Sequence, residues 1–185
     1  MDSKYTHITL VIDRSGSMQS CWNDTMGGLK TLIKKQKKID EKCTFSLYSF
    51  DDTVQKDIDF QHLKLVTENV EDLEIFPRGC TALYDAMGQA INETGKRLAA
   101  MKEVERPGRV NFIIQTDGME NASKEFNKAR IKEMLQEQPQ KYNWTFQFIG
   151  ASLDAVNDAQ SYGIPNKNSA VYNTLNSEDT FTLLG

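Results

Sequence analysis

The chain has 185 residues, of which 39% are hydrophobic and 26% charged, and its formal net charge is −4. This length predicts a single domain over residues 1–185 with a core of its own, and four prolines with eleven glycines exclude a collagen-like or low-complexity chain. An isoelectric point near 5.3 argues against nucleic-acid binding, which needs a basic field around the phosphates.

The first third of the chain predicts a strand, a helix and a β-hairpin. Residues 5–12 (YTHITLVI) are rich in β-branched side chains and end at a polar turn, which is typical of a buried strand. Between about residues 24 and 39, apolar residues recur every three or four positions opposite a lysine-rich face, so we predict an amphipathic helix whose lysines face solvent. Residues 43–50 and 53–60 alternate apolar with polar side chains on either side of a short acidic turn, as in a hairpin.

The rest of the chain alternates helix-like and strand-like blocks. The remaining predicted elements are, in order, an extended segment with one short turn over 61–76, a helix over about 81–101, a buried strand over 110–115, a helix capped by Ser123 that ends near Gln138 before Pro139, a strand over 144–149, a short helix over 153–162 and a short strand over 170–172. Alternation of this kind predicts an α/β fold that is Rossmann-like and doubly wound, with helices on both faces of a mostly parallel sheet.

Polar side chains gather just after two of the predicted strands and at the start of a helix. Asp13, Ser15 and Ser17 follow the first strand, Asp117 follows the strand over 110–115, and Thr81 begins the second long helix. In an open α/β sheet, ligands bind outside the carboxyl ends of the strands, so we expect these five side chains to meet there. Hard oxygen donors of this kind suit Mg²⁺, Mn²⁺ or Ca²⁺ better than zinc or copper.

Each of these pieces alone predicts no more than a turn or a helix cap. Their joint occurrence, each at the end of its own element, predicts a site. Two carboxylates leave a divalent ion incompletely neutralised, so such a site should attract one more anionic oxygen from outside the chain.

In these residues the sequence resembles a von Willebrand factor type A domain, in particular the free-standing kind found in bacteria and their phages. The metal-ion-dependent adhesion site of that family, abbreviated MIDAS, reads D-x-S-x-S, then a Thr, then an Asp in a T-D-G turn. Asp13, Ser15 and Ser17 match the first part, Thr81 within GCTALYDA the second, and Asp117 within TDGMEN the third.

The resemblance implies how the site is used. In the family, the two serines and the threonine bind Mg²⁺ through their hydroxyls, the aspartates act largely through water, and a partner's carboxylate takes the sixth position. The resemblance also implies a six-stranded sheet whose third strand is antiparallel and lies at one edge. Cys80 is the one departure nearby, because it stands where the family pattern would have a second glycine.

Five further residues are candidates for supporting or lining the site: Asp85, Gly16, Gly118, Glu120 and Asn121. Asp85 lies one helical turn after Thr81, where it either orients that loop or serves as a first-turn acid favoured by the helix dipole. His7 and His62 match no motif, and we interpret both as structural.

The cysteines and the N-terminus favour a cytoplasmic location. The three cysteines are an odd number without C-x-x-C spacing, which argues against a disulfide framework or a zinc ribbon and fits a reducing compartment. The N-terminus lacks a basic segment followed by an apolar one, and no apolar run is long enough to cross a bilayer.

Two functions from different classes fit these residues. The first is a non-enzymatic, metal-dependent module that binds a protein partner through an acidic residue at the metal. This function involves neither nucleic acid nor a membrane. The identity of the partner and the oligomeric state stay open. The alternative is a metal-dependent hydrolase, such as a phosphoesterase, which needs a nucleophile or a general base. A phosphatase that forms an aspartyl-phosphate would place a second Asp where Ser15 stands, so we favour the binding module.

Overall fold

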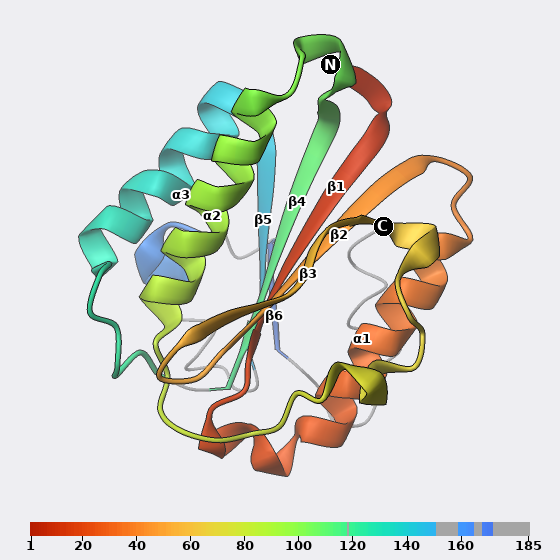
Figure 1. The fold of residues 1–185 in the computed structure, drawn as a ribbon. Coiled ribbons are helices and arrows are strands. Elements are labelled where there is room, and N and C mark those ends of the chain that lie inside the picture. Colours follow the sequence, from red (N-terminus) through yellow and green to blue (C-terminus); the bar gives the residue numbers. More distant parts are fainter. Residues whose placement is uncertain (118, 151–158, 165–167, 172–185) are drawn as a thin grey trace.

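The computed structural model describes residues 1–117, 119–150, 159–164 and 168–171. Within these residues, one six-stranded sheet has the strand order β3-β2-β1-β4-β5-β6 (Figure 1). The strands are β1 (Asp2–Asp13), β2 (Lys42–Phe50), β3 (Val54–His62), β4 (Pro107–Thr116), β5 (Trp144–Gly150) and β6 (Ser169–Val171). Neighbouring strands are parallel except β2 and β3, which pair in antiparallel fashion. The predicted mostly parallel sheet with an antiparallel third strand at its edge is therefore confirmed.

Among the described residues, three long helices cover the two faces of this sheet, as in a doubly wound fold (Figure 1). The helices are α1 (Trp22–Lys37), α2 (Leu83–Ala100) and α3 (Lys128–Tyr142), and the short 3-10 helices are η1 (Gly16–Ser20), η2 (Leu63–Leu65), η3 (Val70–Leu73) and η4 (Glu103–Glu105). Helix α1 packs on one face, and α2 and α3 pack together on the other. None of the helices in the described ranges is both long and apolar enough to span a bilayer.

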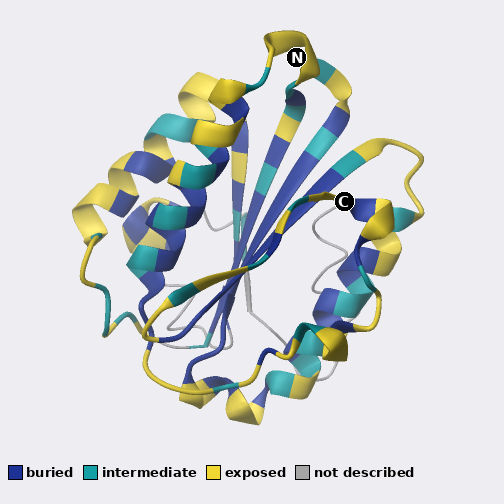
Figure 2. Ribbon diagram, in the orientation of Figure 1, coloured by how far each residue is buried: buried dark blue, intermediate teal, exposed yellow. Residues whose placement is uncertain are grey.

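The core consists of two apolar layers, one on each face of the sheet. Alternate residues of β1 point to opposite faces, so Val11 joins the layer under α2 and α3 while Leu10 and Ile12 join the layer under α1. Toward their carboxyl ends, both faces of the central strands β1 and β4 are buried in this way, and the ribbon there is dark blue (Figure 2). This burial explains the nearly continuous apolar run over residues 110–115 of β4 and the run over residues 8–12 of β1, which only Thr9 interrupts.

The prediction for the third helix was wrong at both ends. Helix α3 begins at Lys128, and its cap is Asn127, whose side-chain oxygen accepts a hydrogen bond from the Arg130 N–H at 3.0 Å. Pro139 lies inside the helix, which continues to Tyr142. The proline removes one helical hydrogen bond, but the buried side chains of this helix, Ile131, Met134 and Leu135, hold it against the sheet.

The other differences are smaller. Residues 61–76 contain two 3-10 helices, η2 and η3, where the sequence predicted a single turn. Residues 159–162 of the predicted short helix are helical, and residues 153–158 of it lie outside the described part of the chain, as does Tyr172 of the last predicted strand.

Candidate metal centre

The predicted ligands lie at the carboxyl ends of the two central strands. Asp13 is the last residue of β1, Ser15 and Ser17 follow it in the turn and in η1, and Asp117 comes directly after β4. Strands β1 and β4 are parallel neighbours, and the strand order reverses between them. This reversal is the place where doubly wound folds bind their ligands.

Hydrogen bonds link the first and the last parts of the motif. The Ser15 N–H donates to Asp13 Oδ1 at 2.7 Å, and the Ser15 and Ser17 hydroxyl oxygens lie 3.0 Å apart. The Ser17 hydroxyl in turn donates to Asp117 Oδ1 at 2.8 Å, although the two residues are 100 positions apart in sequence. Four of the five predicted ligands therefore form one continuous chain of contacts across two loops.

Asp13 is fully buried at the base of this chain. Burial, with a smaller contribution from the nearby charge of Asp117, raises the pKa of its carboxyl to about 6, although the hydrogen bonds from Thr116 and Ser15 act against that rise. A divalent cation beside the two carboxylates would favour their charged forms, because a bound ion is the largest charge in such a site.

Thr81 lies on a third loop that is bonded to both of the others. Its N–H donates to the Asn121 side-chain oxygen at 2.9 Å, and its carbonyl accepts from the Asn121 N–H at 3.0 Å. Two residues before Thr81, the Gly79 carbonyl accepts from the Gly16 N–H at 3.1 Å. The structure thus brings all five predicted ligands onto adjoining loops, which we call the hydroxyl–carboxylate cluster (Asp13, Ser15, Ser17, Thr81 and Asp117).

The candidates around the cluster have distinct roles. Glu120 accepts hydrogen bonds from the Tyr84 N–H at 3.0 Å and from both the N–H and the hydroxyl of Ser123 at 2.7 Å. Asp85 accepts from the backbone N–H groups of residues 124–126 at 2.8 to 2.9 Å. Both carboxylates therefore fasten the start of α2 to the segment that follows β4, rather than lying free at the rim.

Gly16 is exposed beside Ser17 and takes part through its backbone, while Asn121 binds both backbone groups of Thr81. Gly118 lies outside the described residues. The two histidines are away from the cluster: His7 is buried within β1, and His62 accepts a hydrogen bond from the Lys64 N–H at the start of η2.

Sequence reasoning missed the buried carboxylate that holds the loops together. Asp51, in the turn between β2 and β3, contacts Arg14 Nε at 3.1 Å and accepts from Arg78 Nε at 2.7 Å. Its carbonyl also accepts from the Ala82 N–H at 2.9 Å. Burial raises the pKa of Asp51, but the hydrogen bonds from Arg78 and Thr53 and the charge of Arg14 outweigh burial and leave the pKa lowered.

A sequence signal for this network exists only in retrospect. Arg14 directly follows Asp13, and Arg78 precedes Thr81 by three positions, so each of the two loops carries one cation. Nothing in the spacing indicates that an acidic hairpin turn will lie between them.

The departure at Cys80 leaves the loop geometry intact. Gly79 has a φ of +69°, and a Cβ there would lie 2.3 Å from Asp52 Oδ2, so only glycine fits without displacing that side chain. Cys80 itself is exposed, and a hydrogen bond to Asp52, together with the charge of Asp52, raises the pKa of its thiol. The thiol therefore stays protonated at neutral pH.

The donor set fits a hard divalent cation. Across the described ranges, no group of three or more His, Cys, Asp or Glu side chains is placed to hold a metal. A cation at the cluster would therefore rely on hydroxyl oxygens beside the two carboxylates, and that combination suits Mg²⁺, Mn²⁺ or Ca²⁺.

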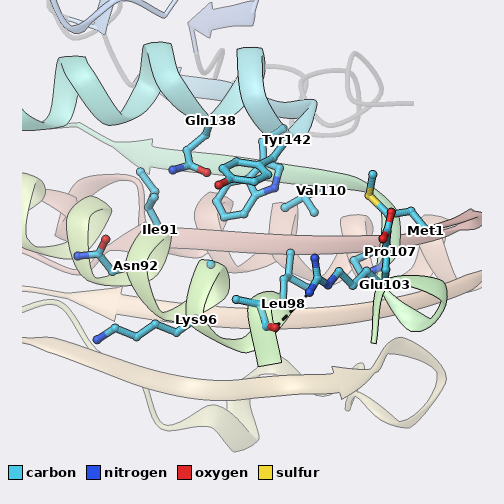
Figure 3. A pocket seen from close by; sticks show the side chains of 14 residues that line it. Met1, Ile91, Asn92, Lys96, Leu98, Glu103, Pro107, Val110, Gln138 and Tyr142 are labelled. Atoms are coloured by element: carbon cyan, nitrogen blue, oxygen red, sulfur yellow. Dashed lines mark hydrogen bonds between the residues drawn. The ribbon is translucent and has the colours of Figure 1, made fainter. Parts of the chain in front are cut away.

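A separate cavity of about 420 Å³ lies at the opposite end of the sheet (Figure 3). Leu98, Val110 and Trp144 contribute apolar surface to it from the end of α2 and the first residues of β4 and β5. Gln138 and Tyr142 reach over it from α3 (Figure 3). The cavity is thus at the amino ends of these strands and shares no residue with the hydroxyl–carboxylate cluster.

These observations define a class of protein: a doubly wound α/β domain with a cluster of oxygen donors where the strand order reverses. The sequence profile of the von Willebrand factor type A domain matches residues 7–183, and the chain belongs to that family. No curated protein matches the sequence.

Solved structures share the fold at low sequence identity. Proximal thread matrix protein 1 from the mussel byssus superposes with a TM-score of 0.67 at 14% identity, over 98% of this chain and 46% of that protein. A von Willebrand factor type A protein from Catenulispora acidiphila gives 0.66 at 14% identity, over 98% of this chain and 42% of its own. Manganese-loaded TRAP protein of Plasmodium vivax gives a TM-score of 0.66 at 19% identity, over 98% of this chain and 72% of that protein.

The chain therefore spans less than half the length of the mussel and Catenulispora proteins. A further structure of the mussel protein is described as having zinc in its MIDAS motif. Structures that share this fold thus include metal-loaded ones, with manganese in one and zinc in the other.

Proposed function

We propose that this protein is a non-enzymatic, metal-dependent module that binds a protein partner. Mg²⁺, or Mn²⁺ or Ca²⁺ in its place, would be held by the hydroxyls of Ser15, Ser17 and Thr81 and, largely through water, by Asp13 and Asp117. A carboxylate of the partner would complete the coordination. The single observation that carries this proposal is the unbroken line of contacts from Asp13 through Ser15 and Ser17 to Asp117.

Accessibility supports a partner rather than a closed structural metal. Asp13 and Ser15 are buried, whereas Ser17 and Gly16 are exposed and Asp117 is half-buried. The cluster is therefore anchored on its inner side and open on its outer side. Two carboxylates balance a divalent charge only incompletely when water lies between, so an outside acid gains a strong charge-assisted contact.

The hydrolase alternative has less support. It needs a nucleophile activated by a nearby base, and both histidines, which are the commonest bases in such sites, lie away from the cluster. The cavity in Figure 3 offers no substitute, because it lies at the other end of the sheet.

Metal titration of matched variants tests the site. Mn²⁺ binding, followed by the loss of the free-ion electron paramagnetic resonance signal, should disappear in Asp117→Ala and persist in Asp40→Ala, which removes a fully exposed carboxylate elsewhere. Equal Mn²⁺ binding by both variants would show that the cluster is not the site.

Partner binding is tested with the same proteins. Proteins retained by the immobilised wild type in Mg²⁺ and released by EDTA should not be retained by Asp117→Ala. A variant with Lys34 and Lys35 both changed to Ala should retain them, because these exposed side chains lie on the outer face of α1. If the lysine variant fails and Asp117→Ala succeeds, the partner docks on the helix and not at the metal.

A further inference from the structure

Two large apolar side chains are exposed on segments that lead to or from the loops of the hydroxyl–carboxylate cluster. Phe76 is 65% exposed and Met119 is 70% exposed. Met119 is two residues beyond Asp117, and Phe76 is two residues before Arg78, whose N–H binds the Arg14 carbonyl at 2.7 Å. Apolar surface that gathers at one functional end of a molecule is typical of an interaction surface.

Phe76 also forms one wall of a cavity of about 530 Å³, which we call the α1 cavity. Trp22 and Met26 of α1 and Ile75 also line it, together with polar residues that include Asn23, Lys30 and Glu71. Helix α1 begins directly after η1, which carries Ser17, so the cavity lies at the same end of the molecule as the cluster (Figure 1).

Gly27 places no side chain in this cavity. It lies in the second turn of α1 and lines the cavity, and a Cβ built there meets no heavy atom within 4 Å. Glycine inside a helix costs about 0.5–1 kcal/mol relative to alanine, and no close contact requires it here. The open space can therefore accept a side chain from another molecule.

We infer that the partner carries a large apolar side chain in the same segment as its acidic residue, and that this side chain fills the α1 cavity. This inference rests on the proposed function. One carboxylate at a metal distinguishes poorly between acidic proteins, whereas burial of one large apolar group beside it adds both affinity and selectivity. The net charge of −4 disfavours an anionic membrane as the occupant.

A phage-displayed random peptide library, selected on the full chain in Mg²⁺ and eluted with EDTA, provides the probe. The inference expects sequences that combine Asp or Glu with a large apolar residue at a recurring spacing. One such peptide is then synthesised for measurements by fluorescence anisotropy. Acidic sequences without an apolar preference would overturn the inference and leave the proposed function intact.

Filling the α1 cavity should weaken the binding of this peptide. Gly27→Trp should raise its Kd about tenfold or more, because the pocket for the apolar side chain is lost. Gly27→Ala, the matched control for the helix, should change Kd by less than about twofold. Both variants should keep the Mn²⁺ affinity of the wild type, because Gly27 does not touch the cluster.

The peptide gives the reciprocal test. Changing its apolar residue to Ala should weaken binding to the wild type but add no further loss with Gly27→Trp, since both changes remove one interaction. Phe76→Ala changes an exposed side chain and should also lower the affinity for the peptide. This second variant keeps the test valid if Gly27→Trp does not fold. Gly27→Trp binding as tightly as wild type would refute the inference.

A library that yields no EDTA-sensitive acidic sequence has a different meaning. That result would contradict the proposed function itself, and the inference that depends on it would fall as well.

Discussion

Each carboxylate oxygen of Asp13 already accepts a hydrogen bond from the protein. Oδ1 accepts from the Ser15 N–H, and Oδ2 accepts from the Thr116 hydroxyl at 2.5 Å. Buried carboxylates need such donors, because an unsatisfied one loses the full energy of its hydration. These two bonds therefore fix the orientation of Asp13 through the protein alone.

Thr116→Val tests this account at the scale of one hydroxyl. The change keeps the shape of the side chain but removes the donor to Asp13 Oδ2, so we expect the free energy of unfolding to fall by about 1–3 kcal/mol. Urea unfolding in EDTA measures the change, and Thr116→Ser, which keeps the hydroxyl, serves as the control. A valine variant as stable as wild type would mean that water replaces the threonine.

His7 is the second residue whose environment makes a prediction. Its ring nitrogens lie 2.9 Å from the Thr44 hydroxyl and 3.0 Å from the Thr9 hydroxyl, and the ring stacks on Phe60. Burial, with a smaller contribution from the charge of Arg97, lowers the pKa of His7 to about 3, although a hydrogen bond to the Thr44 backbone and the charge of Asp59 act in the opposite direction. The folded protein therefore keeps this histidine neutral.

The pH dependence of stability follows from that difference. Below the ordinary pKa of 6.5, the unfolded chain takes up a proton at His7 that the folded chain refuses until pH falls to about 3. Stability from this group is thus complete above pH 6.5 and declines toward pH 3, by up to about 1.4 kcal/mol per pH unit. Urea unfolding across pH 4 to 7 should show a shallower slope for His7→Gln. An unchanged slope would exclude His7 as the source.

At the scale of elements, the β2–β3 hairpin does more than close one edge of the sheet. Its turn places Asp51 between the loop after β1 and the loop before α2, where the carboxylate contacts one arginine from each. Arg14 and Asp51 are both buried. The hairpin therefore positions two of the three loops that carry the cluster without supplying a ligand itself.

Asp51→Ala should unfold more easily and bind metal less tightly. Removing one partner leaves the Arg14 charge buried and unpaired, which costs about 3–5 kcal/mol. Neighbouring Asp52→Ala, in the same turn but exposed, should cost less than about 1 kcal/mol. Urea unfolding and Mn²⁺ titration of both variants separate the two carboxylates. Equal losses would mean that the turn, and not the Asp51 network, supports the loops.

The elements that could be predicted from the sequence are those with a clear apolar period. Strand β1 and helix α1 bury alternate or regularly spaced side chains, and their positions were predicted to within a few residues. The start of α3 was missed because Ser123 and Asn127 are both good caps, and the Ser123 hydroxyl is engaged with Glu120 and the Asp85 N–H instead. Local sequence does not indicate that the distant start of α2 will engage Ser123.

The hydroxyl–carboxylate cluster could be predicted for a similar reason, but the role of Asp51 in holding its loops could not. The proposed ligands stand at strand ends, a position that sequence order indicates. Asp51 acts through two arginines on other elements, 37 and 27 positions away in the chain, so its role appears only once the sheet is assembled.

For the whole molecule, the two apolar layers make folding independent of metal. The core covers both faces of the sheet, and protein hydrogen bonds already orient Asp13 and Thr81. Metal bound with modest affinity adds only about RT ln(1 + [L]/Kd) to stability. Differential scanning calorimetry should show EDTA lowering Tm by about a few degrees. Unfolding at room temperature on chelation would contradict this.

The bond from Ser17 to Asp117 joins residues 100 positions apart, and it has a kinetic consequence. The cluster cannot exist until β1 has paired with β4, and such distant pairing is a slow, late event in folding. Metal bound at the cluster would therefore act after the rate-limiting step, on the completed sheet. In stopped-flow experiments, Mg²⁺ should slow the unfolding phase and leave the refolding rate unchanged. The ion would then stabilise the folded protein only by slowing its unfolding. A refolding rate that rises with Mg²⁺ would show instead that the loops meet early in folding.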